Sequence, residues 1–213
     1  MRAYARPSAA ILALAGVAVL AWAAITLVWG EPFTAVQAAR SQVGLRRELE
    51  QTEALANMRQ GGVTIAARAQ AFRRELRRGS ALGRIVVPRL HLSTVFVEGT
   101  GRSDLARGPG HYRITSLPGL GGTVAIAGHR TTYLQPFRHI DQLQQGDSVY
   151  LELPYGTFRY VVYASRIVDD RDWSILRRRP FEKLVLSACH PLHSASHRIV
   201  VFARLRPSGQ TAA

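Results

Sequence analysis

The sequence has almost no cysteine or lysine and few acidic residues. Cys189 is the only cysteine among 213 residues, so no disulfide can form within the chain and this thiol is either inert or reactive. Lys183 is the only lysine, and 14 acidic residues stand against 28 basic ones, a formal net charge of +14. This imbalance favours an anionic neighbour, either nucleic acid or a lipid or cell-wall surface.

Charge is also missing from a long segment near the N-terminus, Ser8 to Trp29. As a helix this segment would be about 33 Å long, enough to cross a bilayer core. Arg2 and Arg6 precede it and Glu31 follows it, so the positive-inside rule places the N-terminus in the cytoplasm and the remainder outside. A cleaved signal peptide is the alternative, but its apolar region would be shorter. We expect residues 1–30 to form a cytoplasmic tip and a single-pass anchor in the cell membrane.

Composition divides the rest of the chain into three parts. Residues 31–80 are rich in Ala, Gln, Glu, Leu and Arg and are interrupted at Gly61-Gly62, which predicts two helices that form a membrane-proximal stalk. The stalk would be either a spacer or a solvated helix without a partner. Residues 81–207 contain short β-type runs separated by Gly, Pro and Asp, which indicates an all-β barrel or sandwich of seven or eight strands with short helices. Residues 208–213 are small and polar, typical of a disordered tail.

Cys189 stands at the polar end of an apolar run, Leu184 to Ala188, and Arg198 opens the next run, Ile199 to Ala203. If the two runs are consecutive antiparallel strands, Cys189 and Arg198 are neighbours at one end of the sheet. A thiol needs activation, because the thiolate is the nucleophile. His129 follows another apolar run and is the histidine whose position best suits that task. An arginine beside the thiol could stabilise negative charge that develops on a carbonyl oxygen.

Several motifs together resemble the sortases, membrane-anchored cysteine transpeptidases of the bacterial surface. These are Gly128-His129-Arg130-Thr131-Thr132, the Cys189-x8-Arg198 spacing, and the run Glu98-Gly99-Thr100, Gly108-Pro109-Gly110-His111-Tyr112 and Leu117-Pro118-Gly119. The resemblance spans Gly83 to Arg206 and is greatest to class E, with class D as a near relative. It implies a closed sortase-like β-barrel that needs no metal and no organic cofactor.

The resemblance also implies roles for individual residues. Cys189 would be the nucleophile, His129 the general acid and base, and Arg198 the group that holds the substrate carbonyl. Tyr133, Thr131 and Ala188 would contact substrate, and Tyr133 is linked in class E to a preference for Leu-Ala-x-Thr-Gly over Leu-Pro-x-Thr-Gly. The family reads Thr-Leu-x-Thr before the cysteine, whereas this chain has Val185-Leu186-Ser187-Ala188. Ser187 is expected to point away from the position of the missing threonine.

The reaction implied is cleavage of a C-terminal Leu-Pro-x-Thr-Gly-like or Leu-Ala-x-Thr-Gly-like sorting signal between Thr and Gly. A thioacyl intermediate would then be transferred to an amine of a peptidoglycan precursor or to a pilin lysine. Two alternatives stay open: a catalytically impaired sortase-like binding protein, suggested by the missing threonines, and a surface metal-binding module. The second would use Cys189, His190, His193 and His197 as ligands. Nucleic acid is not an expected partner, because the basic residues lack aromatic interleaving and lie outside the membrane.

Overall fold

A computed structural model describes residues 5–29, 32–58 and 64–206, which form two compact units, Met1–Phe33 and Thr34–Ala213. In the first unit, α1 (Ala5–Trp29) exposes apolar side chains such as Ile11 and Leu12. Among the described residues, no helix has both the length and the apolar character that a bilayer crossing requires. The expected anchor is therefore not confirmed. The start of the predicted cytoplasmic tip, the break at Gly61-Gly62 and the predicted tail lie outside the described residues.

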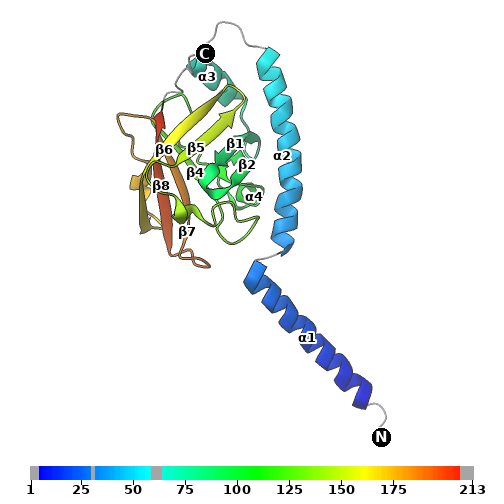
Figure 1. The fold of residues 1–213 in the computed structure, drawn as a ribbon. Coiled ribbons are helices and arrows are strands. Elements are labelled where there is room, and N and C mark those ends of the chain that lie inside the picture. Colours follow the sequence, from blue (N-terminus) through cyan, green and yellow to red (C-terminus); the bar gives the residue numbers. More distant parts are fainter. Residues whose placement is uncertain (1–4, 30–31, 59–63, 207–213) are drawn as a thin grey trace. The chain divides into compact units, whose positions relative to one another are not determined.

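The second unit contains a closed barrel of eight strands in the order β1-β2-β3-β4-β7-β8-β6-β5 (Figure 1). β2 pairs with β3, and β4 with β7, in parallel, and the other neighbours are antiparallel. The predicted all-β barrel is confirmed, and the apolar runs Leu184 to Ala188 and Ile199 to Ala203 are strands. The strands are β1 (Ala81–Val87), β2 (Leu92–Glu98), β3 (Gly110–His111), β4 (Thr123–Ala127), β5 (Ser148–Leu153), β6 (Gly156–Asp169), β7 (Lys183–His190) and β8 (His197–Arg206).

Alternation along the strands separates the barrel interior from its outer surface. On β7, Leu184, Leu186 and Ala188 belong to the interior core, whereas Val185 belongs to a smaller outer cluster. Ile175 covers that outer cluster from the short 3-10 helix η3 (Trp173–Leu176), which lies in the connection from β6 to β7. Three further short helices are α4 (Arg102–Leu105), η1 (Pro88–Leu90) and η2 (Ile140–Gln142).

Helix α2 (Pro32–Met58) packs along β1 and β2 (Figure 1). Leu45 and Leu49 are buried against Ala81, Val95 and Val97, and each buried leucine contributes about 1.5–3 kcal/mol. The Gln42 amide donates to the carbonyls of Val95 (2.9 Å) and Arg107 (2.8 Å), and its oxygen accepts the Val95 N–H (3.0 Å). The part predicted as a stalk is thus helical, but from Thr34 on it is docked on the barrel.

Helix α3 (Ile65–Glu75) is capped by Thr64, whose hydroxyl accepts the Ala67 N–H at 3.3 Å, a common N-cap contact that satisfies a free helical donor. Ala69 is buried in the barrel core, and Phe72 packs against that core with its ring centroid 5.5 Å from that of Tyr155. The helix therefore closes one end of the barrel.

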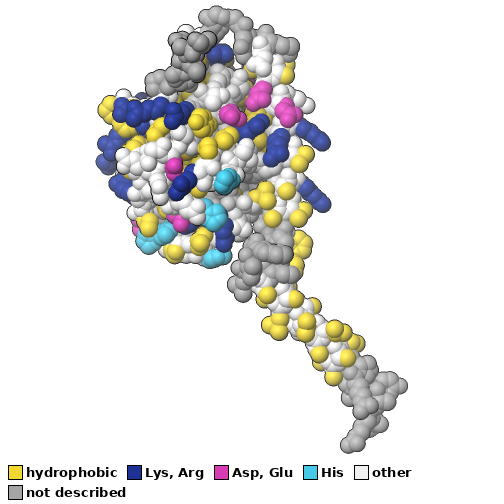
Figure 2. Space-filling view, viewed as in Figure 1, with side chains coloured by type: hydrophobic (Ala, Val, Ile, Leu, Met, Phe, Trp, Pro, Cys, Tyr) yellow, Lys and Arg dark blue, Asp and Glu magenta, His cyan; other side chains and the backbone are white. Residues whose placement is uncertain are grey.

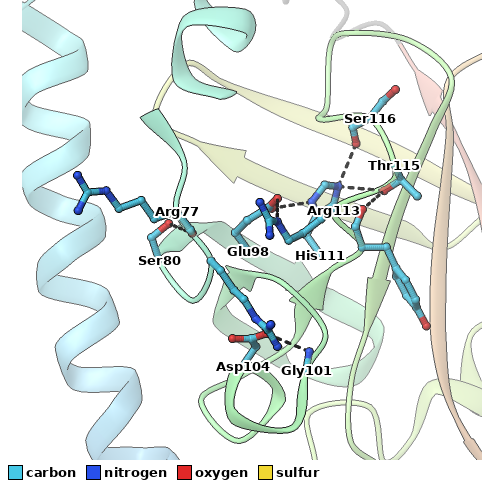
Figure 3. Close-up of polar contacts among 11 residues, drawn as sticks. Arg77, Ser80, Glu98, Gly101, Asp104, His111, Arg113, Thr115 and Ser116 are labelled. Carbon is cyan, nitrogen blue, oxygen red and sulfur yellow. Dashed lines mark hydrogen bonds and ion pairs between the residues drawn. The ribbon is translucent and has the colours of Figure 1, made fainter. Parts of the chain in front are cut away.

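A buried hydrogen bond between Glu98 and His111 joins β2 to β3 (Figure 3). The Glu98 carboxylate lies 2.7 Å from His111 Nδ1, and His111 Nε2 lies 3.0 Å from the Thr115 hydroxyl. His111 is 1% and Glu98 7% exposed, so neither group could be buried at low cost without its partner. Gly110 permits this close pairing, since a Cβ there would lie 2.1 Å from the carbonyl oxygen of Gly99. The sequence motifs that contain Glu98 and His111 therefore hold β2 and β3 together.

Candidate active site

Cys189 and Arg198 are directly opposite each other on antiparallel β7 and β8. Opposed residues project from the same face of a sheet. The next pair inward, Ala188 and Ile199, belongs to the barrel core, so Cys189 and Arg198 are on the outer face. Cys189 is half-buried, which leaves the thiol accessible at the end of its strand. This placement puts the residues Cys189 and Arg198 side by side at one end of the sheet.

His129 reaches the same end of the barrel from β4. The parallel pairing of β4 and β7 ends with Ala127 opposite Ser187, and the Gly128 N–H donates to the Ser187 carbonyl at 3.0 Å. Two residues farther along each chain, His129 and Cys189 are level with one another. Gly128 is required there, because a Cβ would lie 2.5 Å from the Phe137 ring. Cys189, His129 and Arg198 thus lie at one edge of three adjacent strands.

Tyr133 covers the imidazole of His129, with ring centroids 5.1 Å apart. The His129 Nε2 atom is buried and has no hydrogen-bond partner among the described residues. Burial lowers the pKa of His129 below its usual value of 6.5, because removal from water disfavours the imidazolium. The neutral ring, which can accept a proton, is therefore favoured at neutral pH.

The loop after His129 is held in an uncommon conformation. Tyr133, Leu134 and Gln135 have φ angles of 51°, 64° and 50°, which is a sterically unfavourable region for residues with side chains. The Tyr133 N–H donates to the Thr34 hydroxyl of α2 at 3.2 Å, and Leu134 lines a cavity with residues of α2. Helix α2 therefore supports the loop that carries Tyr133.

Arg130 ties the histidine loop to the cysteine strand, and sequence reasoning did not assign it this role. Its side chain is 3% exposed and forms an ion pair of 2.9 Å with Asp141. The same guanidinium donates to the carbonyls of Arg138 (3.1 Å) and Cys189 (3.4 Å). A buried guanidinium with several fixed acceptors is a rigid connector, so Arg130 helps to set the distance between the two catalytic candidates. The sequence feature that could have indicated this role is the position of Arg130 directly after His129.

A small groove next to the cysteine is lined by Ser187, Tyr112, Trp173 and Arg198, together with Ile175, Leu176, Asp169, Asp170 and Asp172. The Tyr112 and Ser187 hydroxyls are 3.2 Å apart, and the rings of Tyr112 and Trp173 meet edge to face at 6.5 Å. Arg198 donates to the carbonyls of Ala195 (2.9 Å) and His197 (3.0 Å), which orients its guanidinium. The groove therefore combines aromatic walls with three aspartates and the cation of Arg198.

The remaining residues predicted to contact substrate fall in different places. Thr131 is half-buried in the loop between His129 and Tyr133. Ala188 differs from the expectation: it is 3% exposed and packs in the barrel core, because residues next to each other on a strand point to opposite faces. Ser187, which sequence reasoning set aside, shares the outer face with Cys189 and lines the groove.

The metal-binding alternative gains no support from the part of the chain that the structure describes. His190 and His197 are opposed across β7 and β8. However, no group of three or more His, Cys, Asp or Glu residues in the described ranges is arranged to hold a metal ion.

Comparisons with known proteins agree with this geometry. The chain is 34% identical to sortase D of Bacillus subtilis over 130 residues, which are 59% of this chain and 64% of that relative. The match therefore spans less than two thirds of the relative's length. It is similar to the structure of sortase E from Streptomyces avermitilis, with 32% identity, a TM-score of 0.55, and coverage of 61% of this chain and 90% of that one.

A Clostridium perfringens sortase D5 structure shares the fold at 23% identity, with a TM-score of 0.63 and coverage of 76% of this chain and 98% of that one. The family model described as the sortase domain matches residues 85–206. This match takes in all eight strands except the start of β1, and it includes His129, Cys189 and Arg198. Because the matched region is more than half of the chain, the protein belongs to the sortase family.

Proposed function

We propose that the protein is a membrane-anchored cysteine transpeptidase of the class E type. In this proposal it cleaves a Leu-Pro-x-Thr-Gly-like or Leu-Ala-x-Thr-Gly-like sorting signal between Thr and Gly. The observation that carries the proposal is the cross-strand pair of Cys189 and Arg198 on the outer face of the barrel, level with His129. The aromatic walls of the adjacent groove, Tyr112 and Trp173, suit the apolar start of such a signal.

The first half-reaction forms a thioester. His129 takes the proton of the Cys189 thiol, and the thiolate attacks the carbonyl carbon of the signal's threonine. Arg198 stabilises the negative charge that develops on the carbonyl oxygen. The carbon–nitrogen bond then breaks, and the imidazolium of His129 gives its proton to the departing glycine amine. The lowered pKa of His129 suits the proton-accepting step.

The second half-reaction restores the thiol. An amine of a peptidoglycan precursor or a pilin lysine attacks the thioester carbonyl, and His129 accepts the proton that this amine loses. The carbon–sulfur bond breaks, and the sulfur recovers a proton from the imidazolium. The new amide joins the sorted protein to the acceptor. The strong net positive charge of +14 suits an enzyme that works next to anionic lipid and cell-wall polymers.

The proposal is tested with the full-length protein in neutral detergent and two peptides that differ only in Pro or Ala at the second signal position. We expect mass spectrometry to detect a thioacyl adduct and release of the glycine fragment. In Cys189→Ala both products should be absent, while near-UV circular dichroism stays unchanged. Arg198→Lys, which keeps the charge but not the fork of donors, should react more slowly. Peptide cleavage at an unchanged rate by Cys189→Ala would reject the proposal.

The second candidate is a catalytically impaired binding protein, and the replacement of the family's threonine by Ala188 favours it. The same experiment separates the two functions. An impaired protein would bind the peptide and form no adduct, whereas the transpeptidase forms an adduct that an added amine resolves.

A further inference from the structure

A second cavity, of about 450 Å³, lies beside the connection from β6 to β7. Five cationic side chains line it: Arg166, Arg177, Arg178, Arg179 and Lys183. Its other lining residues are Tyr163, Ala164, Ser174 and Phe202, so no carboxylate side chain of the described residues contributes to the lining. Figure 2 shows Lys and Arg side chains gathered at the upper left, over the part of the barrel where Figure 1 places this connection.

The cavity is separate from the groove beside Cys189. Lys183 opens β7 and Cys189 comes six residues later on the same strand, a separation of roughly 20 Å in extended backbone. Between them, Ile175 of η3 packs on the outer cluster that contains Val185 and Phe202. The cationic cavity and the groove therefore lie on opposite sides of η3, on the same face of the barrel.

The inner wall of the cavity is rigid. Lys183 is 2% exposed, and its ammonium donates to the carbonyls of Ile175 and Arg177 at 2.8 Å each. The Arg166 guanidinium lies 4.9 Å from the centroid of the Phe202 ring, a cation–π contact that limits its motion. Burial, followed by the neighbouring charges of Arg179 and Arg166, lowers the pKa of Lys183 to about 8. A compact positive potential is thus built into the fold.

Neighbouring acidic groups offset only part of this potential. Glu182 is turned away, because its carboxylate accepts the Gly121 N–H (2.8 Å) and the Tyr160 hydroxyl (2.5 Å). The pKa of Asp172 is lowered mainly by its hydrogen bonds with Ser174 and, to a smaller extent, by the charges of Arg166 and Arg177. Within the described ranges, none of the five cations forms an ion pair with a carboxylate.

We propose that this cavity is a binding site for a phosphate group, with Arg178 and Arg179 as the exposed guanidiniums that close on it. A guanidinium presents a planar fork of donors that matches two phosphate oxygens. Five cations without an acid in the lining suit a multiply charged oxyanion better than a single carboxylate. The phosphate could belong to a lipid headgroup or to a free phosphate ester, and both present the same chemistry to this wall.

The test is isothermal titration of the full-length protein, in neutral detergent, with inorganic pyrophosphate. We expect saturable binding with one site per chain. Arg178→Ala/Arg179→Ala should weaken it roughly tenfold or more, since charge-assisted hydrogen bonds are lost. The matched control, Arg73→Ala/Arg74→Ala, removes the same charge from two exposed arginines of α3 and should bind as the unmodified chain does. Equal weakening in both double variants, or no saturable binding, would overturn the site.

Two further ligands identify the source of the phosphate. Glycerol 3-phosphate and dihexanoyl phosphatidic acid are compared as competitors of pyrophosphate. Stronger competition by the lipid supports a headgroup, and equal competition supports a free phosphate ester. If neither displaces pyrophosphate, the phosphate site is rejected. Because Arg178 and Arg179 are remote from Cys189, peptide cleavage without phosphate should be the same in both double variants, so this test is independent of the proposed transpeptidase activity.

Discussion

At the residue scale, the chemistry of the site depends on how neighbours modify His129. Tyr133 shields the imidazole from water, and the ring nitrogen Nε2 is buried without a partner in the described chain. Burial of this kind favours the neutral ring. A proton can then be taken from a nearby thiol without first removing one from an imidazolium.

The first prediction concerns the pKa of His129 in the folded chain. NMR titration of the histidine ring protons should give a midpoint for His129 below 6.5, because burial lowers its pKa. The unfolded chain then binds more protons below pH 6.5, so the free energy of unfolding should decrease as the pH falls through this region. Tyr133→Ala exposes the ring and should raise the midpoint towards 6.5. An unchanged midpoint in this variant would show that Tyr133 does not shield the imidazole.

The second prediction concerns Arg130 as a positioning residue. Arg130→Gln removes the ion pair with Asp141 and the contact with the Cys189 carbonyl, so the thiol and the imidazole should lose their alignment. We expect kcat for peptide cleavage to fall roughly ten- to hundredfold with little change in KM, since misplacement of about 1 Å has effects of this size. Arg130→Lys should restore part of kcat. A lower Tm of Arg130→Gln with unchanged kcat would instead mean that Arg130 only stabilises the fold.

At the element scale, strand pairing creates the site and helix docking stabilises its surroundings. The parallel pairing of β4 and β7 runs as far as Ala127 opposite Ser187, and this register brings His129 and Cys189 to one edge. Antiparallel β8 returns to that edge and supplies Arg198. Helix α2 contributes no catalytic group, yet its Thr34 hydroxyl holds the loop that contains Tyr133. The position of α2 therefore matters to the site as well as to the core.

The third prediction tests the attachment of α2 through Gln42. Gln42→Ala removes the partners of the Val95 N–H and carbonyl, in a region where Val95 is 1% exposed. Buried unpaired groups of this kind destabilise by about 1–3 kcal/mol each, so chemical denaturation should show a clear loss in the free energy of unfolding. Gln51→Ala changes an exposed glutamine of the same helix and should have almost no effect. Equal stability of the two variants would contradict the bridging role of Gln42.

Much of this architecture could be predicted from short-range patterns. The apolar runs of β4, β7 and β8 indicated strands, and the positions of His129, Cys189 and Arg198 at their ends indicated a shared edge. Docking of α2 could not be predicted, because the partners of Gln42 are more than 50 residues away and the apolar spacing of the helix is uneven. The bracing role of Arg130 was missed because Asp141, 11 residues away, and Cys189, 59 residues away, come together around it only in the folded chain.

At the scale of the whole molecule, the barrel presents two chemically different sites on one outer face. The groove beside Cys189 has aromatic walls, whereas the cavity near Lys183 is cationic. Helix η3 separates them and packs on the apolar cluster between them. Catalysis and recognition of an anion can thus be altered independently. All residues of both sites belong to the unit Thr34–Ala213.

The fourth prediction follows from that division of the chain. A protein of residues 34–213 keeps the barrel, α3 and the described part of α2 after Phe33, including Thr34 and Gln42, so it should fold and cleave the signal peptide at the full-length rate. Residues 64–213 lack Leu45 and Leu49, which removes about 3–6 kcal/mol of apolar burial and exposes their partners Val95 and Val97. This shorter protein should have a lower Tm and slower cleavage. Thermal unfolding and peptide assays of both proteins provide the test, and loss of folding in residues 34–213 would show that the first unit is needed for the stability of the second.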